Sequence, residues 1–212
     1  MSRRLRDRWE YLWQKLDAET VPQEIFDKLV KAYTSPDRFY HNLTHIEDCL
    51  FLFDQTRFLA IHWEEVELAI WFHDAIYDSK RKDNEGRSAE WAKIAIQQGG
   101  LPDGIAGRVS QMILATRHNE EVTDTDAQLM VDVDLSILGR EQDVFWHYEE
   151  NIRKEYAWAP DPLFKQRRIE ILSGFLSRPN LYYHQEFRAR FEEQARVNLR
   201  QALARLSGKA DA

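Results

Sequence analysis

The amino-acid sequence predicts an all-α protein, folded as a single compact bundle of many helices. Apolar residues recur at spacings of three and four along nearly the whole chain, as Leu5, Trp9, Leu12 and Leu16 show near its start. Helix breakers are sparse, with 8 Gly and 6 Pro among 212 residues. Runs of β-branched residues with two-residue alternation, which would indicate strands, are absent from the sequence.

Pro and Gly lie where helices are expected to begin and end. Pro22, Pro102 and Pro162 stand near the starts of periodic segments, where a missing N–H costs nothing, and Asp161 is a candidate N-cap. Gly139 follows a periodic segment, as C-terminal caps do. The predicted helices cover residues 3–17, 22–33, 43–57, 63–78, 84–98, 103–117, 125–138, 141–157, 162–177 and 185–206. Short connections join them, so we expect one domain over residues 1–212.

Charge and cysteine content narrow the function classes. Asp and Glu number 36 against 29 Lys and Arg, which gives a net charge of −7. A net acidic chain is a poor candidate for binding nucleic-acid polymers, because phosphate backbones require clustered cations. Cys49 is the single cysteine, which excludes an internal disulfide and a Cys-rich zinc site. The sequence has neither a membrane span nor an apolar leader, so we expect a cytoplasmic protein.

Two residues of the segment IWFHDAIYD carry the first chemical signal. His73 continues an apolar helical stripe with Ile70 and Tyr77, so it points toward the expected core. Asp74 lies at the edge of that stripe, where a carboxylate is costly unless something compensates its charge. A bound cation would do so directly.

The same reasoning distinguishes two acids in the segment LMVDVDLSILG. Asp132 repeats with Gln128 and Ser136 every four residues, which predicts a solvated polar stripe. Asp134 falls on the apolar stripe and is therefore the acid expected to be buried. His45, in YHNLTHIEDCLFLF, opens a further helix beside apolar residues.

Three helices would thus each direct nitrogen or oxygen ligands inward: His45, His73 with Asp74, and Asp134. Two neutral imidazoles and two carboxylates carry a charge of −2, which matches one divalent cation. Mixed N/O ligation suits Mn, Fe, Co, Ni or Mg, and Zn is an alternative that prefers four ligands.

The order and context of these residues resemble the HD superfamily of metal-dependent phosphohydrolases. The segments YHNLTHI, WFHDAIYD, DNEGRSAEWA, ILATRH and DVDLSILG are similar to a branch of short predicted phosphohydrolases, over nearly the whole chain. The resemblance implies an HD-like helical domain with its ligand core at about 41–138 and helices 141–206 packed on it. It also implies that His45, His73, Asp74 and Asp134 hold the metal.

The resemblance implies hydrolysis of a phosphate ester, with nucleotides among the candidate substrates, by a metal-activated water. Asp74 or Asp78, four residues later on the same predicted helix face, would accept the proton of the water. His118, where a helix meets the polar loop 118–126, is a candidate for a role at the leaving group or for supporting a metal ligand from behind.

The substrate phosphate should meet cations, and a basic cluster follows the His-Asp pair. Lys80, Lys82 and Arg87 are the candidates that the sequence places near the expected mouth. The partner is therefore expected to be a small phosphorylated molecule, and a homodimer is compatible with the sequence. The main alternative is a non-catalytic helical module that binds a ligand or protein around a structural metal. An oxygen-activating iron enzyme would need further ligands, and a nucleic-acid-binding protein would need a basic helix stripe.

Overall fold

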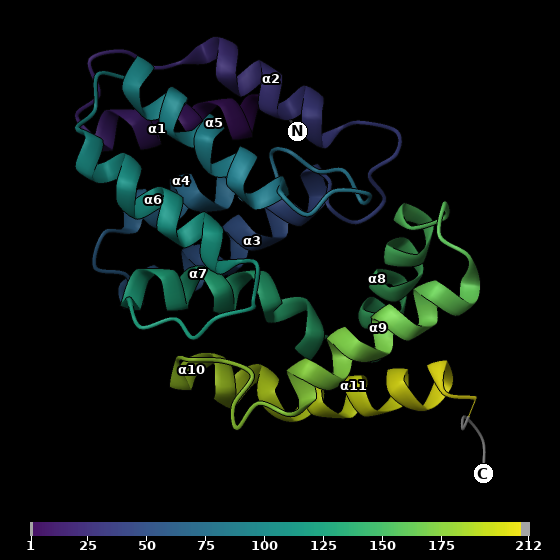
Figure 1. Cartoon of the computed structure of the whole chain (residues 1–212). Coiled ribbons are helices and arrows are strands. Elements are labelled where there is room, and N and C mark those ends of the chain that lie inside the picture. Colours follow the sequence, from purple (N-terminus) through teal and green to yellow (C-terminus); the bar gives the residue numbers. More distant parts are fainter. Residues whose placement is uncertain (1, 209–212) are drawn as a thin grey trace. The chain divides into compact units, whose positions relative to one another are not determined.

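The computed structural model describes residues 2–208 and confirms the all-α fold, with no strand among those residues (Figure 1). Contacts divide the chain into two compact units, residues 1–133 and 134–212, with the boundary inside one helix. The single domain expected from the sequence stays a prediction.

The first unit contains six helices and most of a seventh, together with one short 3₁₀ turn. They are α1 (Ser2–Lys15), α2 (Gln23–Tyr33), α3 (Leu43–Thr56), η1 (Arg57–Leu59), α4 (Trp63–Phe72), α5 (Asn84–Gln98), α6 (Asp103–Ala115) and α7 (Thr125–Leu135). Most bounds fall within two residues of those predicted. The exceptions are α4, which ends at Phe72 rather than at residue 78, and α7, which ends at Leu135 rather than at residue 138.

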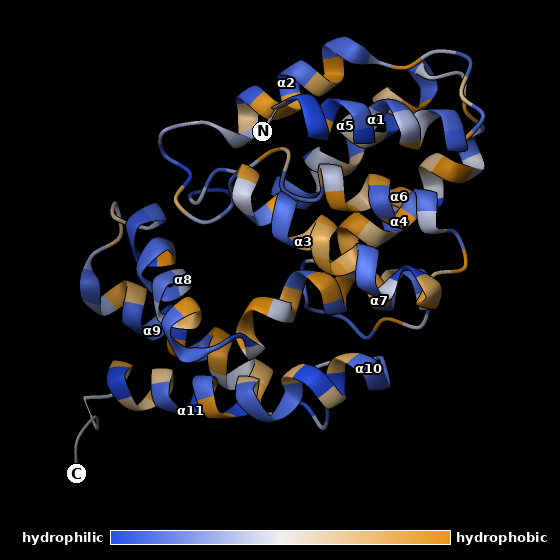
Figure 2. Ribbon diagram, turned by 180° about the vertical axis from the view of Figure 1, so that it is seen from behind, coloured by the Kyte–Doolittle hydropathy of each residue, from blue (hydrophilic) through white to orange (hydrophobic). Residues whose placement is uncertain are grey.

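Helix α4 is the centre of the first unit. All of its residues from Glu65 to Phe72 are buried, and α1, α3, α5 and α6 pack around it (Figure 1). A helix that is buried on every side belongs in the interior of a domain. Figure 2 shows the corresponding concentration of hydrophobic residues on α3 and α4. The end of α4 is therefore held inside a rigid core.

Aromatic packing fixes α1 against α4. The ring centroid of Trp9 lies 5.3 Å from that of Trp13, 5.6 Å from Trp71 and 6.0 Å from Phe72. Tilted and edge-on arrangements at these distances are the favourable ones for aromatic pairs. All four side chains are fully buried, so this cluster forms the hydrophobic centre of the unit.

Two buried glutamates on α4 are paired with arginines from other elements. Glu67 accepts hydrogen bonds from Nε and Nη2 of Arg8 at 2.7 and 2.8 Å, and Arg57 adds a contact of 3.3 Å. Glu65 likewise accepts two hydrogen bonds from Arg108, from Nε at 2.7 Å and from Nη2 at 2.6 Å. Bidentate pairing compensates much of the desolvation cost of a buried carboxylate.

The second unit is also helical. Its elements after the end of α7 are η2 (Ser136–Gly139), α8 (Gln142–Glu155), α9 (Asp161–Leu176), α10 (Gln185–Phe187), the π-helical turn η3 (Arg188–Glu192) and α11 (Glu193–Leu206). Helix α11 packs against α9, η2 and η3. The fully buried Asn198 of α11 donates to the carbonyls of Leu138 and Arg140 at 2.8 Å, which fixes η2 on α11.

No helix within residues 2–208 combines the length and apolar character of a bilayer-crossing segment.

Candidate metal centre

His45 is placed by the start of α3. The Asn42 side chain caps this helix by accepting hydrogen bonds from the amides of Thr44 and His45 at 2.9 and 3.3 Å. Asn is among the best N-cap residues because its oxygen satisfies amides that have no partner within the helix. His45 shares a buried face with Ile46 and Cys49 and is 5% exposed.

His73 and Asp74 stand just beyond the end of α4. The His73 amide donates to the Ala69 carbonyl at 2.9 Å, and the chain then leaves the helix through a turn. The prediction of helix through residue 78 was therefore wrong. The apolar stripe through Ile70 and His73 does point into the core, since His73 is only 1% exposed.

The two imidazoles and the carboxylate converge on one point. Nε2 of His73 lies 3.1 Å from Nε2 of His45 and 3.1 Å from Oδ2 of Asp74, and Nε2 of His45 lies 3.7 Å from that oxygen. His45, His73 and Asp74 form a group whose ligand atoms all lie within 4.8 Å of one another. We call this group the triad. The sequence predicted that these three residues would meet.

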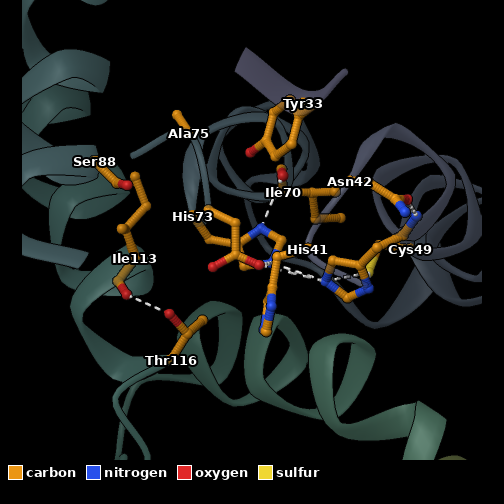
Figure 3. A network of polar contacts seen from close by, with 12 residues as sticks. Tyr33, His41, Asn42, Cys49, Ile70, His73, Ala75, Ser88, Ile113 and Thr116 are labelled. Carbon is orange, nitrogen blue, oxygen red and sulfur yellow. Dashed lines mark hydrogen bonds and ion pairs between the residues drawn. The ribbon is translucent and has the colours of Figure 1, made fainter. Parts of the chain in front are cut away.

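The Nδ1 atom of His73 determines what its other nitrogen can do. Nδ1 lies 2.9 Å from the carbonyl oxygen of Ile70, to which it can only donate (Figure 3). In a neutral imidazole Nε2 then carries a lone pair, and this lone pair faces the carboxylate oxygen of Asp74. Two acceptors at 3.1 Å repel unless a proton or a metal cation lies between them. Ligating histidines use the same second-nitrogen hydrogen bond to fix their orientation.

The carboxyl group of Asp74 is strongly acidic in this setting. Burial by itself would raise its pKa, but the neighbouring imidazoles of His73, His41 and His45 hold the pKa well below its usual range. Its side chain is 16% exposed, so the ionised group is largely withdrawn from water. The site therefore combines a fixed negative charge with two imidazole nitrogens.

The distances in the triad fit a single cation. Nitrogen and oxygen ligands bind such metals at about 2.0–2.2 Å, which puts neighbouring ligand atoms roughly 3.0–3.5 Å apart. Two of the three separations are 3.1 Å and the third is 3.7 Å. The donor set of two imidazoles and one carboxylate suits Mn, Fe, Co, Ni and Zn, while Mg favours oxygen alone.

Aromatic rings line the approach to the triad. The rings of His41 and Tyr77 stack with their centroids 4.2 Å apart, and the ring of Tyr40 lies 4.8 Å from that of His45. His41 is close enough to Asp74 for its charge to lower the pKa of the carboxyl.

The expected burial of the two acids on α7 was wrong. Asp132, predicted to be solvated, is 0% exposed, whereas Asp134, predicted to be the buried acid, is only partly buried. The apolar neighbours explain this reversal: Met130, Val131 and Val133 are all buried, so α7 has no solvated stripe at this level. Asp132 belongs to the same unit as the triad.

Asp134 belongs to the second unit and lies close enough to Tyr148 for its charge to act on the phenol. Burial raises the pKa of the Tyr148 phenol; Arg168 opposes this, and the charges of Glu149 and Asp134 add to the increase. Arg168 is buried and pairs with Glu149, and it donates to the Tyr148 hydroxyl at 2.7 Å. The assignment of Asp134 as a metal ligand stays a prediction.

Asp78 is not on a helix with Asp74, which corrects the shared face predicted for them. It is exposed, and its Oδ1 accepts from the amide of Lys80 at 2.9 Å, which makes it the first residue of a turn. His118 lies after the end of α6, as predicted, with a left-handed φ of 56°.

The basic residues predicted to meet phosphate are all exposed. Lys80 and Lys82 belong to the loop after the triad, and Arg87 lies in the first turn of α5. Arg81, between the two lysines, is held by Asp83 at 2.6–2.7 Å. Oε2 of Glu85, in the same turn of α5 as Arg87, lies 3.6 Å from Nε of Arg117.

Sequence reasoning missed three residues that hold the chain beyond His73. Arg38, Asn84 and Ser88 bind the backbone of residues 74–78 with their side chains. The polar segment DNEGRS was the available signal, because Asn84 and Ser88 are buried polar residues four positions apart on one helix.

Comparisons of the chain with protein-family models, with curated proteins and with solved structures found no match.

Proposed function

We propose that this chain is a metal-dependent phosphohydrolase whose cation is bound by His45, His73 and Asp74. The observation that carries the proposal is the convergence of Nε2 of His73, Nε2 of His45 and Oδ2 of Asp74 within 3.7 Å. The resemblance of the surrounding motifs to the HD superfamily supplies the reaction class.

Protonation alone is a poorer explanation of this arrangement. One proton on Nε2 of His73 would satisfy either His45 or Asp74 at full strength, because an N–H has a single direction. A cation at the centre would satisfy all three groups together, and the Asp74 carboxylate would offset part of its charge. This electrostatic argument supports a metal more directly than the occurrence of a His-Asp pair in the sequence.

A fourth ligand would come from α7. The family resemblance assigned Asp134, but the complete burial of Asp132 favours Asp132 for this role. An ionised carboxylate without exposure to water needs a compensating charge or several hydrogen bonds. We therefore propose Asp132 as the first candidate and Asp134 as the alternative, and the two are separable by substitution.

The metal, when bound, would supply Lewis-acid charge stabilisation and lower the pKa of a bound water. Asp74 remains ionised at neutral pH, which suits it to binding the cation, but its lowered pKa makes its carboxylate a weak proton acceptor. Asp78 is the other candidate for the base, with one of its oxygens engaged by the Lys80 amide. His118 is kept as the candidate acid for the leaving group.

The phosphate group would meet the loop after the triad. Lys80, Lys82 and Arg87 present exposed cations directly after the turn that carries Asp74. Exposed cations attract an anionic substrate over about 8–10 Å at physiological salt. We propose a small phosphate ester as the substrate, and nucleotides belong to this class.

The test begins with protein purified without chelator. Elemental analysis gives the bound metal, and a panel of phosphate esters and nucleotides with Mn, Mg, Co and Ni gives the activity. We expect metal-dependent phosphate release that Asp74→Ala abolishes. Asp48→Ala, at an exposed position on α3, is the matched control and should retain activity. A wild-type protein that holds stoichiometric metal but releases no phosphate from any member of a broad panel would instead favour the binding module.

A further inference from the structure

The turn that carries Asp74 is not held by a helix. Helix α4 ends at Phe72 and the His73 amide makes its last i→i−4 hydrogen bond, so the residues from Asp74 onward lack the regular bonds that fix a side chain on a helix. The Ala75 amide donates to the Phe72 carbonyl at 2.9 Å, an i→i−3 bond of a turn rather than of a helix. The position of Asp74 must therefore depend on other contacts.

Arg38 supplies the first of these contacts. Its Nη1 donates to the carbonyls of Asp74 and His41 at 2.6 and 3.1 Å, and its Nη2 donates to the carbonyl of Ala75 at 2.9 Å. The guanidinium also lies over the rings of Tyr33 and Tyr77, at 5.1 and 5.7 Å from their centroids. A planar fork of donors can bind several carbonyls at once, which an ammonium cannot do in the same geometry.

Ser88 and Asn84 supply the rest from α5. The Ser88 hydroxyl accepts from the amide of Ile76 at 3.0 Å and donates to its carbonyl at 3.3 Å. The Asn84 side chain accepts from the amide of Asp78 at 3.2 Å and donates to its carbonyl at 3.0 Å. Ser88 is 0% exposed and lies beside the chain after His73 in Figure 3.

The spacing of these two residues matches the chain that they hold. Residues four apart on a helix lie about 5–6 Å apart on one face. Ser88 and Asn84, on one face of α5, thereby bind the backbone of Ile76 and Asp78, which are two residues apart. We call Arg38, Asn84 and Ser88 the backbone clamp.

We propose that the backbone clamp positions Asp74 for metal binding, so that these three residues are positioning residues of the site. The inference rests on the proposed metal site. Asp74 is the one triad member outside any helix, since His45 lies in α3 and His73 caps α4. Groups that orient a metal ligand without touching the metal typically contribute about 10–100-fold to metal affinity.

The test measures Co²⁺ binding to the full chain, by titration and by the visible absorption spectrum, which reports coordination geometry. Ser88→Ala removes both contacts to Ile76 and keeps a good helix former. We expect its Co²⁺ affinity to fall about 10–100-fold with a changed spectrum. Ser110→Ala, on α6 and without a side-chain contact to the turn, should bind as the wild type does.

Two further variants separate positioning from loss of folding. Asn84→Ala removes the contacts to the exposed Asp78, four residues from Asp74, so it should fold and lower the affinity less than Ser88→Ala does. In an Asp74→Ala background, Ser88→Ala should produce no additional loss, because the clamp acts through Asp74.

The outcomes are distinct. A wild type that takes up no Co²⁺ would overturn the metal site and the positioning role together. If the wild type binds Co²⁺ and both Ser88→Ala and Asn84→Ala match its affinity and its spectrum, the positioning role alone would be overturned. An equal loss from Ser88→Ala with and without Asp74 would also overturn it, because the effect would then bypass Asp74.

Discussion

Nε2 of His45 lies 3.1 Å from Nε2 of His73, and the second nitrogen of His73 is committed to the Ile70 carbonyl. The two rings reach this point from the start of α3 and the end of α4, which are 28 residues apart in the sequence. Their meeting is the geometric basis of the proposed site, and the predictions below depend on it.

Loss of the triad carboxylate should remove activity without unfolding the protein. Asp74→Ala deletes one ligand from a turn at the end of α4, while the aromatic core around Trp9 stays intact. We expect metal-dependent phosphate release to fall more than about 100-fold, beyond the usual effect of an outer-sphere group. Circular dichroism should show unchanged helix content. Retention of full activity would remove Asp74 from the mechanism.

The two acids of α7 should differ in their effect on metal binding. Asp132→Asn keeps the size of the buried side chain and removes its charge, so it should lower the metal affinity strongly. Asp134→Asn, in the second unit, should have a smaller effect. Isothermal titration with Mn²⁺ measures both, and each variant controls for the other. The reverse order would restore Asp134 as the fourth ligand.

Metal affinity should rise with pH between about 5.5 and 8. A cation binds the neutral imidazole, and the reference pKa of histidine is about 6.5, so protons compete at the acidic end. The lowered pKa of Asp74 keeps its carboxylate ionised over this range, and it is lost as a ligand only at more acidic pH. Metal titrations at several pH values measure how the affinity changes with pH. An affinity that does not change over this range would contradict ligation by histidine.

Arg38→Lys should weaken the site although it preserves the charge. A lysine ammonium cannot bridge the carbonyls of His41, Asp74 and Ala75 as the guanidinium does. We expect a loss of metal affinity of about tenfold or more, measured by Co²⁺ titration. Lys93→Arg exchanges the same two residue types at an exposed position on α5, and as a control it should bind as the wild type does. Equal affinity of Arg38→Lys and wild type would exclude a role for the fork geometry.

A stability variant should separate the fold from the site. Arg8→Ala leaves the buried Glu67 with only the longer contact to Arg57. Removing one partner of a buried ion pair typically lowers the free energy of unfolding by about 3–5 kcal/mol. We expect the lower end of this range, because Arg57 remains near Glu67 and Arg8 is partly exposed. Urea unfolding measures the change. A loss below about 1 kcal/mol would show that Arg57 alone compensates Glu67.

Sequence periodicity predicted most helices because each has one buried face and a recognisable end. It failed after Phe72, where the apolar stripe continues through His73 and Tyr77 although the helix has ended. There the backbone is bound by the side chains of the backbone clamp and not by helical hydrogen bonds. Contacts from residues distant in the sequence leave no local periodic signal. The same limit applies to Asp132, whose environment on α7 is apolar on more than one side. The convergence of His45, His73 and Asp74 was predictable because each was an anomalous polar group on an apolar face.

The most direct measurement is anomalous X-ray diffraction from crystals grown with Mn²⁺. We expect one peak about 2.0–2.3 Å from Nε2 of His45, Nε2 of His73 and a carboxylate oxygen of Asp74. A peak at another place on the molecule, or none at saturating Mn²⁺ with the three side chains ordered, would contradict the proposed metal centre.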